Sequence, residues 1–214
     1  MSSAGSLVKG GRFNIGKDIN PTQFPPYPAL YVAENYNTAY AEKFGVPETT
    51  EIDGLSGHEL ALRKPTSFTS VNISGKLNNL FDVSKTGNIR EFVNVIKRFE
   101  IPAELKVLAR KLGMKPPFNL TEITQLKQNL LSNDWRAWPI QIQLPANSQI
   151  FGRLIMEAGF EGIIYPSVKG KGKCIAIFPE NLAGTDSYVE VSDKAPDGVV
   201  HMKLDGRTWV DLTQ

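Results

Sequence analysis

The chain has 214 residues, which is enough for one domain with a self-sufficient hydrophobic core. Apolar residues make up 41% of the chain and charged residues 21%, a balance that excludes a disordered or collagen-like protein. The formal net charge is only +2 and the lysines and arginines are scattered, so we expect no nucleic-acid partner.

Cysteine and histidine are too scarce for several common kinds of site. Cys174 is the single cysteine, which excludes an intramolecular disulfide and suits a reducing cytoplasm. With only His58 and His201 beside it, we expect no metal site. The sequence also lacks a nucleophile elbow, a Walker loop, an N-terminal signal peptide and any apolar run near the ~20 residues of a membrane helix. We therefore expect a soluble cytoplasmic protein with no membrane partner.

The first third of the chain predicts a loop, a strand and a helix in succession. Residues 15–28 contain four prolines and favour an extended loop, and residues 29–33 (Ala-Leu-Tyr-Val-Ala) are typical of a short strand. Asn35 is a suitable N-cap for a helix that runs to about Phe44 and stops at Gly45. These elements bring Tyr31, Glu34 and Glu42 into one local unit.

The middle of the chain predicts further strands and then a helical insertion at about residues 86–135. Residues 58–63 alternate as a strand does, and residues 68–73 are rich in β-branched side chains that favour a continuation of the sheet. The insertion shows amphipathic stripes at helical spacing, formed by Ile89, Phe92, Val93, Ile96 and Phe99, by Leu105, Leu108 and Leu112, and by Ile123, Leu126 and Leu130. We interpret these stripes as packing surface.

The last third predicts a helix over residues 148–158 that Gly159 ends, followed by buried strands at 162–165 and 174–178. Ser167 lies in the connection between these strands. Asp205-Gly206 between two apolar runs predicts a C-terminal hairpin at about residues 197–213. The pattern as a whole predicts an α+β protein, residues 1–214 forming a single domain.

Several segments, in the same order, resemble the signature of the RES family, named for an arginine, a glutamate and a serine. Residues 10–14 read Gly-Gly-Arg-Phe-Asn, residues 30–34 read Leu-Tyr-Val-Ala-Glu, and a helix with Ala39, Ala41 and Glu42 follows. Later matches are Trp135-Arg136, Ser148-Gln149, the Pro-Ser end of residues 159–167 and the strand at 175–179. The resemblance covers about residues 6–45 and 132–183. It departs from the family before Gly10, where the nine preceding residues leave the usual first strand shortened, absent or replaced.

The resemblance implies a fold related to the ADP-ribosyltransferases, with a mixed β-sheet core. It also implies a toxin that breaks the bond between nicotinamide and ribose in NAD, with an Xre-type antitoxin as protein partner. NAD is then a substrate, and no cofactor is retained. The nicotinamide ring is positively charged in NAD and becomes neutral as it leaves, so no acid needs to protonate the leaving group. A single carboxylate can then suffice where a glycosidase commonly uses two.

The resemblance also assigns roles to individual residues. Glu42 is expected to hold the ribose hydroxyls and stabilise the oxocarbenium-like charge. Arg12 is expected to bind the pyrophosphate or the ribose, and Tyr31 to stack on or position the nicotinamide ring. The remaining cofactor-binding residues are Asn14, Ser167 and Lys173, and Lys173 shares with Lys169 and Lys171 a basic stretch suited to phosphate.

Two questions stay open at the level of the sequence. Glu34 competes with Glu42 for the role of the key carboxylate, and spacing favours Glu42. The acceptor is water, inorganic phosphate as a co-substrate, or a protein side chain, and the last of these would make the enzyme a protein ADP-ribosyltransferase. A further alternative is a non-catalytic interaction module that keeps the fold.

Overall fold

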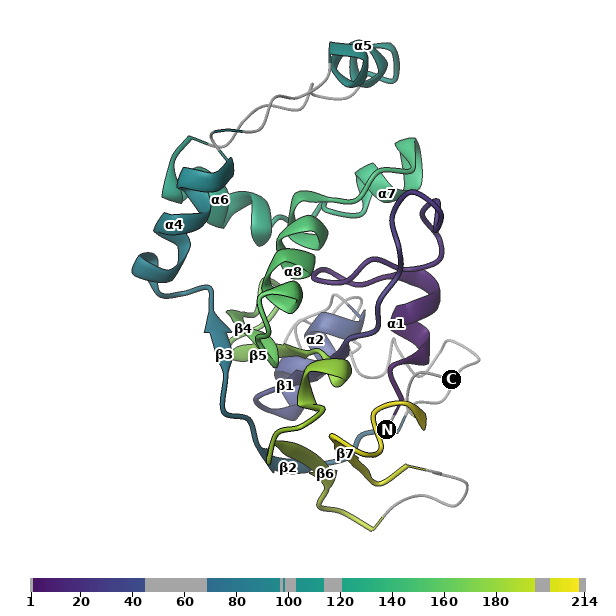
Figure 1. Ribbon diagram of the computed structural model, residues 1–214, viewed down its shortest axis with the longest axis vertical. Coiled ribbons are helices and arrows are strands. Elements are labelled where there is room, and N and C mark those ends of the chain that lie inside the picture. The colour runs from purple at the N-terminus through teal and green to yellow at the C-terminus, as the bar shows by residue number, and fades with distance from the viewer. Residues whose placement is uncertain are drawn as a thin grey trace, which may run out of the picture.

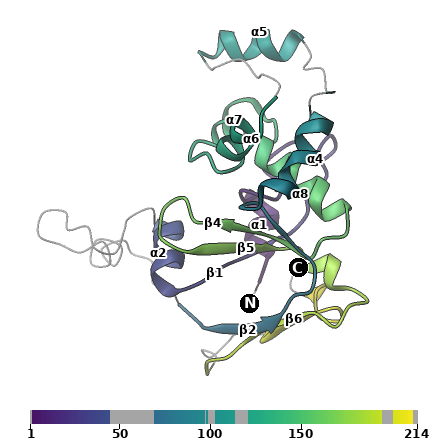
Figure 2. The same cartoon turned by 90° about the vertical axis from the view of Figure 1, so that its left-hand side faces the viewer.

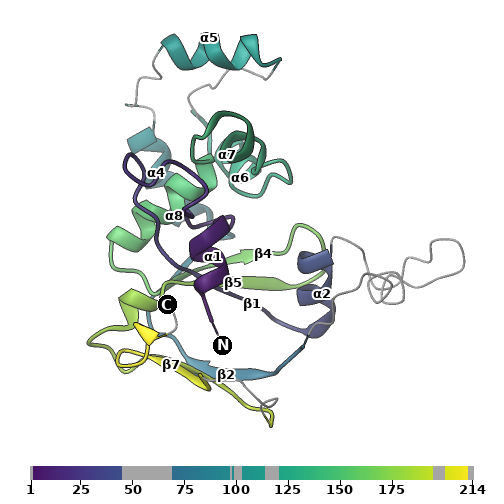
Figure 3. The same cartoon turned by 90° about the vertical axis from the view of Figure 1, so that its right-hand side faces the viewer.

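A computed structural model describes residues 2–44, 69–96, 98, 103–113, 121–194 and 201–211 of the chain. It is an α+β structure in which helices cover one face of a four-stranded sheet and a second, three-stranded sheet covers the other (Figures 2 and 3). The expected fold class is therefore confirmed. No helix in the described ranges is long and apolar enough to cross a bilayer.

The larger sheet has the strand order β1-β5-β4-β3 and is mixed. Its strands are β1 (Leu30–Ala33), β3 (Leu80–Asp82), β4 (Gly162–Pro166) and β5 (Lys173–Ile177). β5 pairs antiparallel with β1 and β4, whereas β3 pairs parallel with β4. The register places Tyr31 opposite Ala176, and Cys174 between Ala33 and Tyr165.

The two faces of this sheet belong to different hydrophobic clusters, as the alternation of side chains along a strand requires. Cys174, Ala176 and Tyr165 face the larger cluster, which is built with Phe13, Phe151 and residues of the helical layer. Ile175 and Ile177 face a smaller cluster shared with the second sheet. The second sheet has the order β2-β6-β7, formed by β2 (Ile73–Lys76), β6 (Tyr188–Val191) and β7 (Lys203–Asp205).

Several helices contribute residues to the larger cluster, which also contains Cys174 and Tyr165 of the sheet. In chain order the helices are α1 (Ala4–Lys9), α2 (Tyr36–Phe44), α4 (Thr86–Ile96), α5 (Ala103–Lys111), α6 (Ile123–Leu130), α7 (Ala137–Ile142) and α8 (Asn147–Glu157), with a 3-10 turn η1 at Pro179–Leu182. α2 lies at one end of the sheet, and α5 lies farthest from the strands (Figures 1 and 2).

Most elements that the sequence predicts are present within a residue or two of their expected bounds. The strand after the proline-rich loop, the helix after Asn35, helices within residues 86–135, α8 and the strands β4 and β5 are confirmed. The second stripe of the insertion is not packing surface, because Leu108 and Leu112 are exposed. Asn35 caps α2 as expected, because its Oδ1 accepts the backbone N–H of Thr38 at 2.9 Å. Residues 58–63, Phe68 and Gly45 lie outside the described residues.

Three expectations at the ends of elements need correction or refinement. The prediction of a C-terminal hairpin is wrong: residues 206–210 form turns, and β7 pairs with β6 instead of a following strand. The β-branched run that ends at Ile73 contributes only that residue to β2, because residues 69–72 lie outside any strand. Before Gly10 the chain forms the helix α1, so a helix replaces the first strand that the family usually has there.

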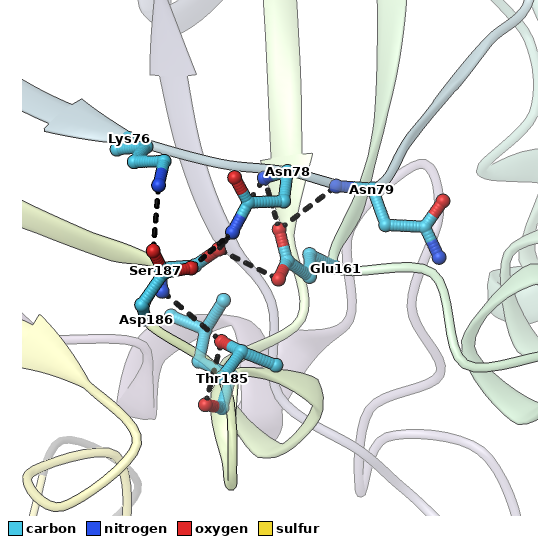
Figure 4. A network of polar contacts seen from close by, with 8 residues as sticks. Lys76, Asn78, Asn79, Glu161, Thr185, Asp186 and Ser187 are labelled. Carbon is cyan, nitrogen blue, oxygen red and sulfur yellow. Dashed lines mark hydrogen bonds and ion pairs between the residues drawn. The ribbon is translucent and has the colours of Figure 1, made fainter.

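A polar junction connects the two sheets on the side away from α2. Glu161, 2% exposed, lies just before β4 and accepts backbone N–H groups from Asn78 at 2.6 Å and Asn79 at 3.1 Å through Oε2 (Figure 4). Its Oε1 accepts the Ser187 hydroxyl at 2.7 Å, just before β6. A buried carboxylate therefore fixes the starts of β3, β4 and β6 to one another.

Candidate active site

Arg12 is a buried cation held against the end of α6. The residue is 6% exposed, and its Nη1 donates to the carbonyl oxygens of Leu130 at 3.2 Å and Ser132 at 2.6 Å. Leu130 ends α6 and Ser132 follows two residues later, so Arg12 lies at the C-terminal end of the helix, where the helix dipole favours a positive charge. Burial lowers the pKa of Arg12, which remains a cation at neutral pH. In the described chain the Arg12 side chain makes hydrogen bonds only through Nη1, which leaves Nε and Nη2 for a ligand.

Tyr31 fixes the loop that carries Arg12. Its hydroxyl accepts the backbone N–H of Phe13 at 2.8 Å and donates to Asn14 Oδ1 at 3.0 Å. A Cβ at Gly11 would lie 2.4 Å from the same hydroxyl oxygen, so the ring needs a glycine at that position. Burial raises the pKa of Tyr31 above its ordinary value, which keeps the phenol neutral.

The Asn14 side chain is committed within the protein. It is fully buried, and its Nδ2 donates to the carbonyl oxygens of Ser6 at 2.8 Å and Tyr27 at 2.9 Å while Oδ1 holds Tyr31. This geometry favours a positioning role for Asn14 over the direct contact with NAD that the sequence led us to expect.

Glu42 and Ser167 meet directly, although 125 residues separate them. The Ser167 hydroxyl donates to Glu42 Oε1 at 2.6 Å, and the backbone N–H of Val168 donates to the same oxygen at 3.1 Å. The hydroxyl also accepts the backbone N–H of Gly170 at 2.9 Å. Ser167 thus orients Glu42, and no hydrogen bond to Glu42 Oε2 is present among the described residues.

Glu34, the competing carboxylate, has a structural task. It is exposed, its Oε2 accepts the backbone N–H of Lys173 at 2.8 Å, and its own N–H donates to the Lys173 carbonyl at 2.9 Å. These bonds fix the start of β5 to the end of β1. The geometry therefore favours Glu42 over Glu34 as the carboxylate of the site.

The basic stretch between β4 and β5 divides between the two faces of the sheet. Lys169 lies beside the site, because its Nζ donates to the Glu42 carbonyl at 3.2 Å, and Lys171 accepts the Thr38 hydroxyl through its carbonyl oxygen. Lys173 alternates with Cys174 along β5 and so shares the face of Ile175, away from the site. The structure does not bring the Lys173 side chain together with Glu42.

Tyr165 and Cys174, which the sequence did not predict as site residues, lie beside Arg12 and Glu42. They are partners in the register of β4 and β5, and both belong to the larger hydrophobic cluster. Burial, with the nearby Glu42 charge, raises the pKa of Cys174 to about 12, so the thiol is protonated and unreactive at neutral pH. The one available signal was alternation: in a strand that holds Ala176 inward, Cys174 faces inward as well.

Trp135 and Arg136 form the rim beside Arg12. The Arg136 Cζ lies 4.4 Å from the centroid of the Trp135 ring, and the Arg12 Cζ lies 6.0 Å from the same centroid. Trp135 is half-buried and Arg136 is exposed. Two cations therefore contact one indole.

The arginine, glutamate and serine of the site thus come from a loop, a helix and a strand connection that meet at one end of the larger sheet. The family model of the RES domain matches residues 1–197, which includes all three. No curated protein and no solved structure matches the chain. The chain belongs to the RES family, a family associated with toxins that act on NAD and with toxin–antitoxin modules.

Proposed function

We propose that this protein is a toxin that degrades NAD by cleaving the glycosidic bond between nicotinamide and ribose. One observation carries the proposal: the Glu42 carboxylate is held rigidly through Oε1 while Oε2 has no hydrogen bond among the described residues, and the buried Arg12 cation lies near it. Membership in the RES family supports NAD as the substrate.

The chemistry of the bond explains why one carboxylate is enough. The ring nitrogen of nicotinamide is positively charged in NAD, and it takes the bonding electron pair as it leaves neutral. The ribose then carries the positive charge as an oxocarbenium-like species. Glu42 stabilises that charge and binds the ribose hydroxyls through Oε2, an interaction that is strongest in the transition state.

The other residues orient the substrate. Arg12 offers Nε and Nη2 to the phosphate next to the nicotinamide ribose, and the half-buried ring of Tyr31 stacks on nicotinamide. Ser167 and Asn14 are positioning residues, since they hold Glu42 and Tyr31 respectively. The side chains of Tyr165 and Cys174 lower the local polarity, which strengthens the interactions of both charges with the substrate.

The acceptor and the protein partner are part of the same proposal. Water gives ADP-ribose and a proton, and inorganic phosphate held by Lys169 and Lys171 gives ADP-ribose 1-phosphate. The relation to the ADP-ribosyltransferases that the resemblance implies is consistent with either outcome. We further propose that an Xre-type antitoxin keeps the enzyme inactive in the cell.

The test is a measurement of nicotinamide release from NAD by the purified protein, with and without inorganic phosphate. We expect release by the wild-type protein and a loss of at least about a hundredfold in Glu42→Gln, since a positioned electrostatic group commonly contributes about 3 kcal/mol to catalysis. Glu34→Gln is the matched control, because it changes a nearby carboxylate that has a structural task.

Each outcome identifies a different error. Background release from the wild-type protein would reject the enzymatic proposal in favour of an interaction module. Loss of activity in Glu34→Gln with full activity in Glu42→Gln would make Glu34 the key carboxylate, and the proposed reaction would stay the same. Transfer of label from NAD to a polypeptide, with no free ADP-ribose, would make the enzyme a protein ADP-ribosyltransferase.

A further inference from the structure

Arg136 is an exposed guanidinium with a fixed place at the rim of the site. It lies against the half-buried Trp135 ring with its Cζ 4.4 Å from the centroid, so a cation–π contact restrains a side chain that would otherwise sample many rotamers. The three ion pairs found in the described chain do not include it. A restrained and uncompensated cation is prepared to bind an anion.

The position of this cation relative to Arg12 is the second observation. Arg12 contacts the same indole and also donates to the carbonyl of Ser132, three residues before Trp135. Burial raises the pKa of Tyr31, and the positive charges of Arg12 and Arg136 act against that rise. The two guanidinium groups therefore both contact Trp135, Arg12 buried and Arg136 exposed.

A pair of cations at different depths fits a ligand with two linked phosphates. A guanidinium presents a planar set of donors that matches phosphate oxygens, and its charge-assisted bonds are stronger than neutral ones. A pyrophosphate places its second phosphate next to the first, so a buried and a rim guanidinium can each contact one. A monophosphate held at Arg12 would leave Arg136 without a ligand.

We propose that Arg136, oriented by Trp135, binds the distal phosphate of a dinucleotide substrate and thereby selects dinucleotides over mononucleotides. This inference rests on the proposed function for its substrate, and it adds a subsite outside the Arg12, Glu42 and Ser167 group. Arg136 binds substrate in the ground state and the transition state alike, so its removal raises KM and leaves kcat nearly unchanged.

The kinetic test compares NAD with nicotinamide mononucleotide, which lacks the distal phosphate. Arg136→Ala should lower kcat/KM for NAD about tenfold, mainly through KM, the loss expected for one charge-assisted bond. For the mononucleotide the change should stay within about twofold. Arg12→Ala should lower kcat/KM for both substrates. Arg207→Ala, which removes an exposed arginine beside the second sheet, is the matched control and should change neither.

A binding test separates this inference from the proposed function. By calorimetry, ADP-ribose should bind the wild-type protein and Arg207→Ala alike, and Arg136→Ala about tenfold more weakly, while ribose 5-phosphate should not distinguish them. If the wild-type protein releases no nicotinamide but the affinities are as expected, the proposed cleavage of NAD is rejected and the phosphate subsite at Arg136 is supported. Equal affinity of ADP-ribose for wild type and Arg136→Ala would overturn the subsite, as would a failure of ADP-ribose to bind the wild-type protein.

Discussion

At the scale of single residues, the Ser167 hydroxyl is the contact on which the orientation of Glu42 depends. Ser167→Ala removes the 2.6 Å bond to Oε1 and leaves only the longer bond from Val168. Because a hydrogen bond to a charged group contributes about 1.5–3 kcal/mol, we expect kcat for nicotinamide release to fall about tenfold to a hundredfold. Steady-state kinetics on the purified variant measure the change.

Two further variants separate orientation of Glu42 from general damage. Ser167→Thr keeps a hydroxyl and should recover most of the lost kcat. Ser192→Ala removes an exposed hydroxyl that donates to Ser74 on the second sheet, and it should leave kcat unchanged. An unaltered kcat in Ser167→Ala would show that Val168 alone is sufficient to orient the carboxylate.

The thiol of Cys174 gives a second test at the residue scale. Its pKa is raised to about 12, above the ordinary value of 9.0, so the group holds its proton as the pH rises through 9 and 10. The thiol is therefore almost entirely protonated at pH 8. We expect iodoacetamide to leave Cys174 unmodified in the folded protein at pH 8 and to modify it fully in urea, as measured by intact mass. Rapid alkylation of the folded protein would show that Cys174 is open to solvent.

At the scale of elements, α8 and the Arg12 loop pack in direct backbone contact. A Cβ at Gly152 would lie 2.1 Å from the Phe13 carbonyl oxygen, and Gln149 Nε2 donates to the carbonyls of Gly11 at 3.1 Å and Asn14 at 3.0 Å. Alanine normally stabilises a helix interior relative to glycine, by about 0.5–1 kcal/mol. Here we expect Gly152→Ala to destabilise the protein by about 1–3 kcal/mol, because it overpacks this contact.

The matched control for this prediction is another glycine in a helix. A Cβ at Gly87 in α4 would meet nothing within 4 Å, so Gly87→Ala should be neutral or stabilising. Thermal and urea unfolding measure both variants. Gly152→Ala should also lower activity per folded molecule, because it displaces the loop that holds Arg12. A stabilised Gly152→Ala protein would contradict the close approach of α8 to Phe13.

At the scale of the whole molecule, Glu161 connects the two sheets. The Glu161 carboxylate accepts three hydrogen bonds. In Glu161→Gln an NH2 group takes the place of one oxygen and cannot accept a hydrogen bond from the donor or donors that it faces. We expect the free energy of unfolding in urea to fall by about 2–3 kcal/mol, since buried donors lose their acceptor. Activity of the folded fraction should stay unchanged.

Glu157→Gln provides the comparison, because it also removes a glutamate charge. Its carboxylate is half-exposed in an i,i+4 pair with Arg153, so the change should cost less than about 1 kcal/mol. Equal effects of the two substitutions would mean that the junction at Glu161 contributes no more than a surface pair does.

The sequence predicted those features that depend on local pattern. The apolar run before Glu34, the cap at Asn35, the stripes of the insertion and the strands around Ser167 all specify their elements through neighbours a few residues away. The C-terminal hairpin failed for the complementary reason. Asp205-Gly206 is a local turn signal, but β7 gains its hydrogen bonds from β6, and no local pattern encodes that partner.

The sequence by itself determined the α+β class, most element positions and the residue types of the candidate site. Only the tertiary structure decided how these residues divide their tasks. It joined Glu42 to Ser167, committed Glu34 to the start of β5, enclosed Asn14, turned Lys173 to the other face and placed Arg136 beside Arg12. The physical reason is that local pattern fixes which side of a strand or helix a residue occupies, whereas its hydrogen-bond partners and burial depend on segments more than a hundred residues away.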